Sequence, residues 1–217
     1  MKAKSYKDWE RVLTKELCLL WGKSDKFLPC HGPEHHLRVW QKAEAFGRKK
    51  KADLEVLLAA CLFHDAASFD ASLPCDHAAR SAKIAAKVLQ KVRFPVQKAK
   101  EAVRAIGDHR SRCQGKTSLE AKIMKSFDKL EALGPIGVYR VLTPWSIRKY
   151  PLSEIVNWAL GEKRLAKKWN SIPFPELKKK YLADYRYSVN YFKKLAQELK
   201  LSKPRKSSIL EKKMYYE

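Results

Sequence analysis

The feature that most constrains the fold of this chain is an apolar run that ends in two adjacent polar residues, His64 and Asp65, within the stretch CLFHDAASFD. The run follows Asp53, a residue type that commonly begins helices, and its apolar residues recur at helical spacing. A buried aspartate without a partner is very costly, and a bound metal ion is one remedy. The sequence therefore predicts a helix over 53–65 with a polar site at its carboxyl end.

Apolar residues recur at helical spacing along most of the chain, and no stretch alternates with period two for long enough to suggest a strand. Within 145–175, which is richer in Pro, Trp and Ser, we expect irregular structure around one helix. We expect a first helix near the N-terminus and further helices over 35–47, 53–65, 76–91, 95–109, 117–134 and 176–200. These patterns predict an all-α fold with a single domain.

Residues that favour helix ends mark several of these boundaries. Gly47 is a plausible end for the helix over 35–47. Pro95 suits the first turn of the helix over 95–109. The sequence TSLE has the form of a capping box, and Gly134 with Pro135 is expected to end or kink the helix that it begins.

The domain organisation follows from what the sequence does not contain. With no internal repeat and no clear linker, we expect one helical domain over 1–201 and a basic flexible tail over 202–217. No apolar run approaches the roughly 20 residues that span a bilayer. The five cysteines are odd in number and form no C-x-x-C pair, which argues against a disulfide framework and favours a cytoplasmic protein.

The chain is strongly basic, with 46 Lys and Arg against 23 Asp and Glu and a net charge of +23. Such a charge attracts polyanions or phosphorylated substrates, although a lysine-rich proteome or a thermophilic surface would explain it equally well. The basic residues are scattered along helices, which weakens a prediction of sequence-specific nucleic-acid binding. Residues 161–217 hold 16 basic and 6 acidic residues. Aromatic rings interleave this segment and can stack on bases, but most lie at the helical spacing of a core: Trp169, Tyr181, Tyr185, Tyr187 and Tyr191.

All six histidines lie in the first half of the chain, and four fall at or near the expected helix ends: His35, His64, His77 and His109. Asp128 lies within a later expected helix. Side chains at neighbouring helix ends can converge in a bundle, and neutral imidazoles together with carboxylates bind divalent transition metals. Taken singly, each residue could be a helix cap or a hydrogen-bonded core histidine, so the metal-site hypothesis depends on their combination.

The order of these residues resembles the H…HD…D signature of the HD superfamily of metal-dependent phosphohydrolases. HHLRV is similar to the H-x-x-R-V opening of this family, which singles out His35 rather than His36 as the ligand. LLAACLFHD resembles its apolar helix ending in HD, and LEAKIMKSFDKLEALGPIG resembles the segment whose metal-binding aspartate aligns with Asp128. HAARSAKIAAKVL and AVRAIGDH resemble its H-x-x-x-S and I-x-x-H segments.

The resemblance covers about residues 28–200, and the segment ADYRYSVNYFKKLAQEL is similar to the helix that closes uncharacterised single-domain members of the family. Three departures affect the positions that face the substrate, and one of them is that RSR follows His109 in place of the usual small and hydroxyl residues. Ser126 replaces the first aspartate of the family's D-A-D, and no glutamate or lysine closely follows His64 and Asp65 as a general acid. The resemblance therefore leaves the substrate open.

The resemblance implies an HD-type helical bundle that holds one or two divalent metal ions (Mn, Fe, Co, Ni, Zn or Mg). His64 and Asp65 would lie at the catalytic centre, and Asp65 would bridge two ions. The implied ligands of the first ion are His35, His64, Asp65 and Asp128, and those of the second are Asp65, His77 and His109. Arg38, Arg80 and Lys83 are candidates for phosphate contact or for support of the ligands, with surface ion pairs or solvated charges as the ordinary explanation.

The implied activity is hydrolysis of a phosphomonoester or phosphodiester bond in a nucleotide or similar small phosphorylated substrate by metal-activated water. Two alternatives stay open: an HD-type nuclease or phosphodiesterase that acts on RNA or DNA, and a basic nucleic-acid-binding module with a metal site. The six-ligand set argues against the last, because a purely structural site needs neither so many ligands nor open positions. No membrane partner is expected, and the sequence does not indicate an oligomeric state.

Overall fold

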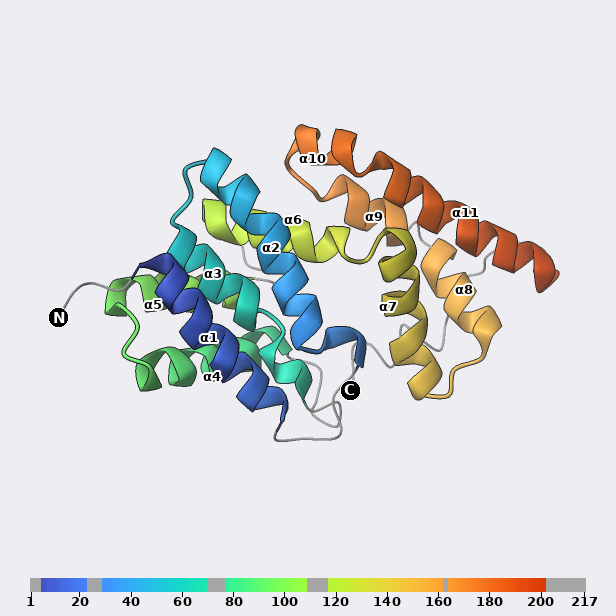
Figure 1. Cartoon of the computed structure of the whole chain (residues 1–217). Helices are drawn as coiled ribbons and strands as arrows, with labels where there is room; N and C mark the ends of the chain where they lie inside the picture. Colours follow the sequence, from blue (N-terminus) through green and yellow to red (C-terminus); the bar gives the residue numbers. More distant parts are fainter. Residues whose placement is uncertain (1–4, 23–28, 70–76, 109–116, 162–163, 202–217) are drawn as a thin grey trace. The chain divides into compact units, whose positions relative to one another are not determined.

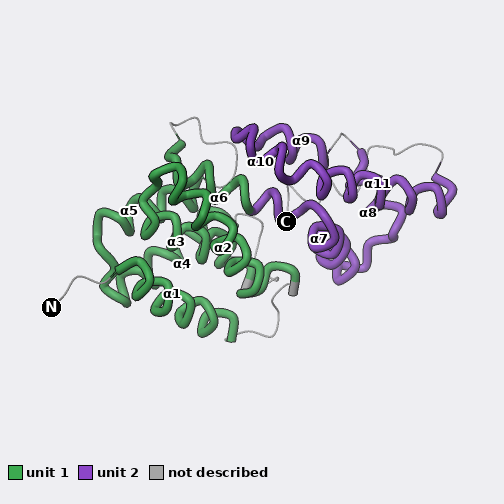
Figure 2. The backbone as a smooth tube through the Cα atoms, turned by 45° about the horizontal axis from the view of Figure 1, so that its top comes forward, with its two compact units in different colours: residues 1–127 green, residues 128–217 purple. Residues whose placement is uncertain are grey.

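The structure, a computed structural model, describes residues 5–22, 29–69, 77–108, 117–161 and 164–201. Every regular element in these ranges is a helix (Figure 1), which confirms the predicted all-α fold class. Contacts divide the chain into two compact units, residues 1–127 and 128–217 (Figure 2), and the division falls inside helix α6 (Leu119–Leu130). A single domain over 1–201 stays a prediction, and the tail over 202–217 lies outside the described residues. None of the helices in the described ranges has the length and apolar character that crossing a membrane requires.

The first unit is built around α3 (Leu54–Phe63), in which every residue from Val56 to Phe63 is buried. A helix that is apolar on all sides needs cover on all sides, and α3 packs against four neighbouring helices. The described elements of this unit besides α3 and α6 are α1 (Tyr6–Trp21), η1 (Pro29–His31), α2 (Pro33–Lys49), η2 (Ala66–Phe69), α4 (His77–Lys91) and α5 (Val96–Gly107). The residues that follow α3 are thereby held within the unit.

Asp53 begins α3 as the sequence predicts. Its Oδ1 accepts hydrogen bonds from the backbone N–H groups of Glu55 at 2.9 Å and Val56 at 3.2 Å. The capping box expected at TSLE is not formed as predicted: Ser118 Oγ accepts from the Ala121 N–H at 3.1 Å, and Glu120 Oε1 accepts from the Asp53 N–H at 3.1 Å. The carboxylate of Glu120 therefore joins the start of α6 to the start of α3.

Gly47 does not end its helix, because α2 continues to Lys49. Gly47 is buried, and a Cβ atom at this position would overlap Cδ2 of Leu57 on α3. The glycine is therefore a position of close packing between α2 and α3 rather than a helix stop. Pro95 likewise lies one position outside the expected first turn, since it is the N-cap residue of α5.

The second unit contains α7 (Gly134–Ile147), α8 (Leu152–Leu160), α9 (Arg164–Asn170), α10 (Pro175–Lys180) and α11 (Leu182–Glu198), and all of the first four contact α11. The prediction of irregular structure around one helix in 145–175 is therefore wrong, because α8 and α9 both lie there. Pro151 is the N-cap of α8 and Pro175 begins α10, so these prolines mark helix starts. The helix expected over 176–200 is divided at Tyr181.

Gly134 and Pro135 begin α7, shortly after α6 ends at Leu130, so the helix ends close to the position that the sequence predicts. Gly134 has a φ of +72°, a conformation that favours glycine, and its N–H donates to Ser188 Oγ on α11 at 2.8 Å. Pro135 follows in the first turn of α7. This glycine therefore ties the start of α7 to α11.

Candidate metal centre

His64 follows directly after α3 and is fully buried, as its C-cap residue. Its Nδ1 lies 2.9 Å from the carbonyl oxygen of Cys61 in the last turn of α3. Helix ends leave their last carbonyl groups without intrahelical partners, so this carbonyl is available as an acceptor. Because a carbonyl only accepts, Nδ1 carries the hydrogen, and the Nε2 of neutral His64 then presents a lone pair.

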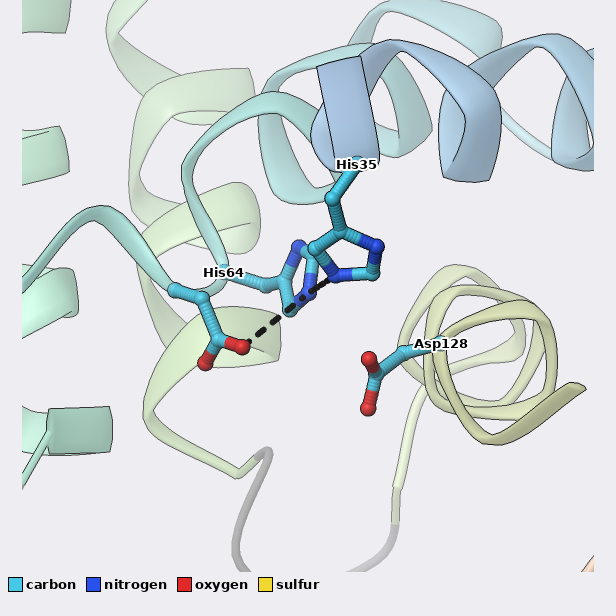
Figure 3. Close-up of side chains that lie close together, drawn as sticks. His35, His64 and Asp128 are labelled. Atoms are coloured by element: carbon cyan, nitrogen blue, oxygen red, sulfur yellow. Dashed lines mark hydrogen bonds and ion pairs between the residues drawn. The ribbon is translucent and has the colours of Figure 1, made fainter. Parts of the chain in front are cut away.

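His35 lies in the first turn of α2 and is also buried, with a relative exposure of 1%. Its Nε2 lies 3.2 Å from the Nε2 of His64. Figure 3 shows the two rings directed toward one another. Two buried imidazole nitrogens that face each other across this distance are a donor pair suited to a shared cation.

Two carboxylates complete a cluster with these histidines. The ligand atoms of His35, His64, Asp65 and Asp128 all lie within 4.8 Å of one another, and the first three residues are buried. Asp128 lies on α6, and its carboxylate is turned toward the two rings (Figure 3). The four residues predicted to hold the first ion are therefore brought together by the fold.

Asp65 contacts two different histidines through its two oxygens. Its Oδ2 lies 3.6 Å from Nε2 of His64, and its Oδ1 lies 3.6 Å from Nε2 of His77 at the start of α4. His77 is more accessible than the cluster, with a side-chain exposure of 31%. His109, the other ligand expected for a second ion, lies outside the described residues.

The resemblance to the HD superfamily favours His35 over His36 as a metal ligand, yet His36 lies against the same site. Its Nδ1 lies 3.4 Å from the Cys61 carbonyl oxygen that also contacts His64, and its ring lies 4.9 Å from the ring of Trp21. Complete burial, followed by the nearby rings of His64 and His35, holds the pKa of His36 well below its usual value. His36 is therefore a neutral packing residue behind the cluster.

Ser81 holds the segment that follows Asp65. This fully buried side chain on α4 accepts a hydrogen bond from the Ala67 N–H at 3.0 Å, and the Ser68 N–H donates to the Asp65 carbonyl at 2.8 Å. These bonds fix the short helix η2 against α4. The serine that the sequence placed four residues after His77 thus supports the backbone beside Asp65.

The basic residues singled out from the sequence have different surroundings. Arg38 lies 3.7 Å from the exposed carboxylate of Glu34 on the same helix, as expected for a surface ion pair. Arg80 is half-buried on α4, and Lys83 is exposed. A role in phosphate contact stays a prediction for all three.

One residue near the cluster was missed from the sequence. Arg140 on α7 is buried, and its Nη2 lies 3.4 Å from Oδ1 of Asp128. An arginine within the apolar helix sequence GPIGVYRVL was a signal, since arginine is almost never fully buried unless it is paired.

The donor set fits a divalent transition metal. Neutral imidazoles and carboxylates are the nitrogen and oxygen ligands that such ions prefer, and two negative carboxylates balance a charge of +2. The hydrogen bond to Cys61 orients the His64 ring in the manner usual for metal-binding histidines, whose other nitrogen donates to a carbonyl or carboxylate. His35, His64, Asp65 and Asp128 are therefore the residues that would hold the ion.

Comparisons with known proteins agree with this geometry. The family model described as HD domain matches residues 33–133, a range that contains all four residues of the cluster. A search of curated proteins finds no match.

Several solved structures share the fold. A predicted HD superfamily hydrolase from an uncultured Thermotogales bacterium is 23% identical, with a TM-score of 0.57 over 85% of this chain and 92% of that chain. Bacillus subtilis YpgQ in complex with ADP is 19% identical, with a TM-score of 0.69 over 89% and 96%. An HD-superfamily hydrolase from Bacillus thuringiensis is 17% identical, with a TM-score of 0.66 over 91% and 100%. Residues 33–133 thus match the HD domain family, and the solved structures share the fold of the chain.

Proposed function

We propose that this protein is a cytoplasmic, metal-dependent phosphohydrolase that cleaves a phosphomonoester or phosphodiester bond in a nucleotide or similar small phosphorylated molecule. The observation that carries the proposal is the cluster of two imidazoles and two carboxylates, whose ligand atoms lie within 4.8 Å of one another. The net charge of +23 favours an anionic substrate. The complex of YpgQ with ADP, a protein of similar fold, supports a nucleotide in particular.

Each residue of the cluster has a role that follows from its surroundings. A bound divalent ion supplies Lewis acidity and a hydroxide nucleophile near neutral pH. His64 presents Nε2 because its Nδ1–H is held by the Cys61 carbonyl. Asp65 and Asp128, which lie far apart in the sequence, supply negative charge. Burial of His35, His64 and Asp65 limits their contact with bulk water, which strengthens their interaction with a cation.

We further propose that the site accepts a second ion, held by Asp65, His77 and His109. The two oxygens of Asp65 face different histidines, His64 and His77, each at 3.6 Å. A carboxylate arranged in this way can bridge two ions, and paired ions clamp a phosphate group.

The test is a screen of nucleotides and small phosphate esters with the purified protein under several divalent ions, alongside metal analysis. We expect hydrolysis that EDTA abolishes and that a divalent ion restores. His64→Ala and Asp65→Ala should each lose bound metal and activity while the helical circular dichroism spectrum is kept. Glu101→Gln, an exposed residue on α5, is the control and should behave as the wild type. Full activity in a His64→Ala, Asp65→Ala double variant would exclude this function.

Nucleic acid is a second candidate substrate or partner, favoured by one feature of α11. The interpretation of the C-terminal aromatics as core is wrong for Tyr187 and Tyr191, which are exposed at 46% and 37%. Their rings are nearly parallel, with centroids 6.4 Å apart and an interplanar angle of 21°. They line an open groove of about 400 Å³ together with Lys194 and Glu198, which lie 3.7 Å apart, and stacked rings beside a cation suit the bases and phosphates of a single strand.

This candidate is tested by fluorescence anisotropy with a single-stranded oligonucleotide at about 50 mM salt. A Tyr187→Ala, Tyr191→Ala variant should bind roughly tenfold more weakly, since base–aromatic stacking contributes about 1–3 kcal/mol per base. Tyr139→Ala removes an exposed tyrosine from α7 and serves as the control. Equal binding by the double variant and the control would remove the support that α11 gives to this candidate.

A further inference from the structure

Arg140 is the buried basic residue of α7, and its guanidinium contacts Asp128 at two points. Nη2 lies 3.4 Å from the carboxylate oxygen Oδ1, and Nη1 lies 3.5 Å from the backbone carbonyl oxygen of the same residue. The side chain of Arg140 is 6% exposed and that of Asp128 is 18% exposed. Two contacts to one residue restrict both its backbone and its side chain, which a single ion pair on a flexible stem does not achieve.

The turn between α6 and α7 explains how Arg140 reaches Asp128. A Cβ atom at Gly137 would overlap the backbone carbonyl group of Ala132, so α7 approaches this turn more closely than any other residue type would allow. Arg140 lies three residues after Gly137 and therefore on the same face of α7. The close approach at Gly137 thus brings the guanidinium to the end of α6, where Asp128 lies.

We propose that Arg140 is a positioning residue that holds the Asp128 carboxylate in the orientation in which it faces His35 and His64. The proposal rests on the metal-dependent function proposed above. Contact with Oδ1 is compatible with cation binding through the second carboxylate oxygen. Outer partners that hold ligating carboxylates in this way commonly contribute 10- to 100-fold to metal affinity.

The experiment measures Mn²⁺ binding to the full-length protein by isothermal titration calorimetry, with thermal unfolding recorded in EDTA and in Mn²⁺. Arg140→Met keeps the bulk of the side chain and removes its charge and hydrogen bonds. We expect this variant to bind Mn²⁺ about 10- to 100-fold more weakly and to show a smaller Mn²⁺-induced rise in Tm. Arg140→Lys should give an intermediate Kd, because one ammonium group cannot contact both oxygens of Asp128 as the guanidinium does.

Arg148→Met is the matched control, since Arg148 is an exposed arginine at the end of the same helix. It should leave the Mn²⁺ Kd unchanged. A purely structural role for Arg140 predicts a lower Tm in EDTA with an unchanged Kd, and that result would overturn the proposal, as would tighter Mn²⁺ binding by Arg140→Met. If Arg140→Met does not fold, a wild-type Kd in Arg140→Lys would overturn it equally.

The two proposals fail in different ways. If the wild-type protein binds no Mn²⁺ and no other divalent ion, the proposed metal-dependent function is wrong. The positioning role of Arg140 is then wrong as well, because it rests on that function. If the wild type binds Mn²⁺ and Arg140→Met binds it equally well, only the positioning role is wrong.

Discussion

At the scale of single residues, one main-chain group organises much of the site. The Cys61 carbonyl oxygen lies 2.9 Å from Nδ1 of His64 and 3.4 Å from Nδ1 of His36. It belongs to the last turn of α3, where carbonyl groups lack intrahelical partners. A helix that ends directly before a histidine can therefore fix the tautomer of that histidine through a free carbonyl of its last turn. His64, the first residue of the HD dipeptide, lies at such a position after α3.

Under the proposal of a second ion, the number of bound ions depends on His77. His77→Ala removes the imidazole that faces Oδ1 of Asp65, so we expect the metal content to fall from two ions per chain to one, with a loss of most of the hydrolytic rate. Metal analysis by mass spectrometry after dialysis measures this directly. Lys87→Ala, an exposed change on the same helix, should keep both ions. Identical stoichiometry in the wild type and His77→Ala would rule out a second ion held by His77.

Asp53 gives a pH-dependent contribution to stability. Burial raises the pKa of Asp53, but the hydrogen bonds from Lys98 and from the Val56 N–H outweigh burial, and its pKa is lowered below the ordinary 3.8. A carboxyl group with a lowered folded-state pKa stabilises the fold above its unfolded-state pKa and loses that contribution as the pH falls through the folded-state pKa.

We therefore expect Asp53→Asn to lower the Tm at pH 7 and to have a progressively smaller effect below about pH 4. Thermal unfolding of the wild type and the variant between pH 3 and pH 7 measures the difference. Glu101→Gln is the control on the exposed surface of α5. A Tm difference that stays constant over this range would contradict the role assigned to the ionised carboxylate.

At the scale of helices, two glycines set distances between neighbours. Gly47 lets α2 approach Leu57 on α3, and Gly137 lets α7 approach the backbone of Ala132. The obstacle at Gly47 is the end of a side chain, which can move, whereas the obstacle at Gly137 is backbone, which moves only with the turn. The second position is therefore the more restrictive one.

A series of alanine substitutions tests this difference. Gly107→Ala is the control, because the nearest atom to its new Cβ is 4.0 Å away, and alanine favours helix by up to about 1 kcal/mol over glycine. Gly47→Ala should destabilise the protein by about 1–3 kcal/mol through overpacking, and Gly137→Ala should cost more. Urea unfolding provides the free energies. Equal stability of all three variants would mean that neither glycine is required for close packing.

At the scale of the whole molecule, charge is the dominant property. The net charge of +23 includes five basic and two acidic residues within 202–217. Charge that is spread over many helices attracts anions without selecting among them. We therefore expect the selectivity of the protein to depend on the cluster around His64 rather than on the overall field.

Deletion of residues 202–217 separates these two contributions. We expect weaker binding to RNA or DNA and a reduced salt dependence, because fewer counterions are released when fewer basic residues meet phosphates. Hydrolysis of a small phosphate ester should be unchanged, since the cluster lies outside the deleted segment. Anisotropy titrations at several salt concentrations and a steady-state assay give the two readouts. Loss of hydrolysis with unchanged nucleic-acid binding would contradict the expectation that the tail contributes to nucleic-acid binding and the cluster to hydrolysis.

Much of the fold was predictable from local patterns. Helical spacing predicts the all-α class, and Asp53 predicts the start of α3, because a side-chain cap depends only on residues a turn away. The prediction failed where a residue serves a distant neighbour, as at Gly47 and in 145–175. The prediction of a capping box at TSLE failed for the same reason, because Glu120 accepts a hydrogen bond from the Asp53 N–H at the start of α3 rather than from the start of its own helix.

The sequence by itself determined which residues form the candidate site: an apolar helix that ends in His64 and Asp65, with His35 and Asp128 in a recognisable order. Only the tertiary structure decided how they are held. The Cys61 carbonyl and the buried Arg140 meet the site through space, and no periodicity encodes a main-chain acceptor or a contact across a turn. Helical patterns report on neighbours three or four residues apart, whereas the orientation of a ligand is set by groups that folding brings beside it.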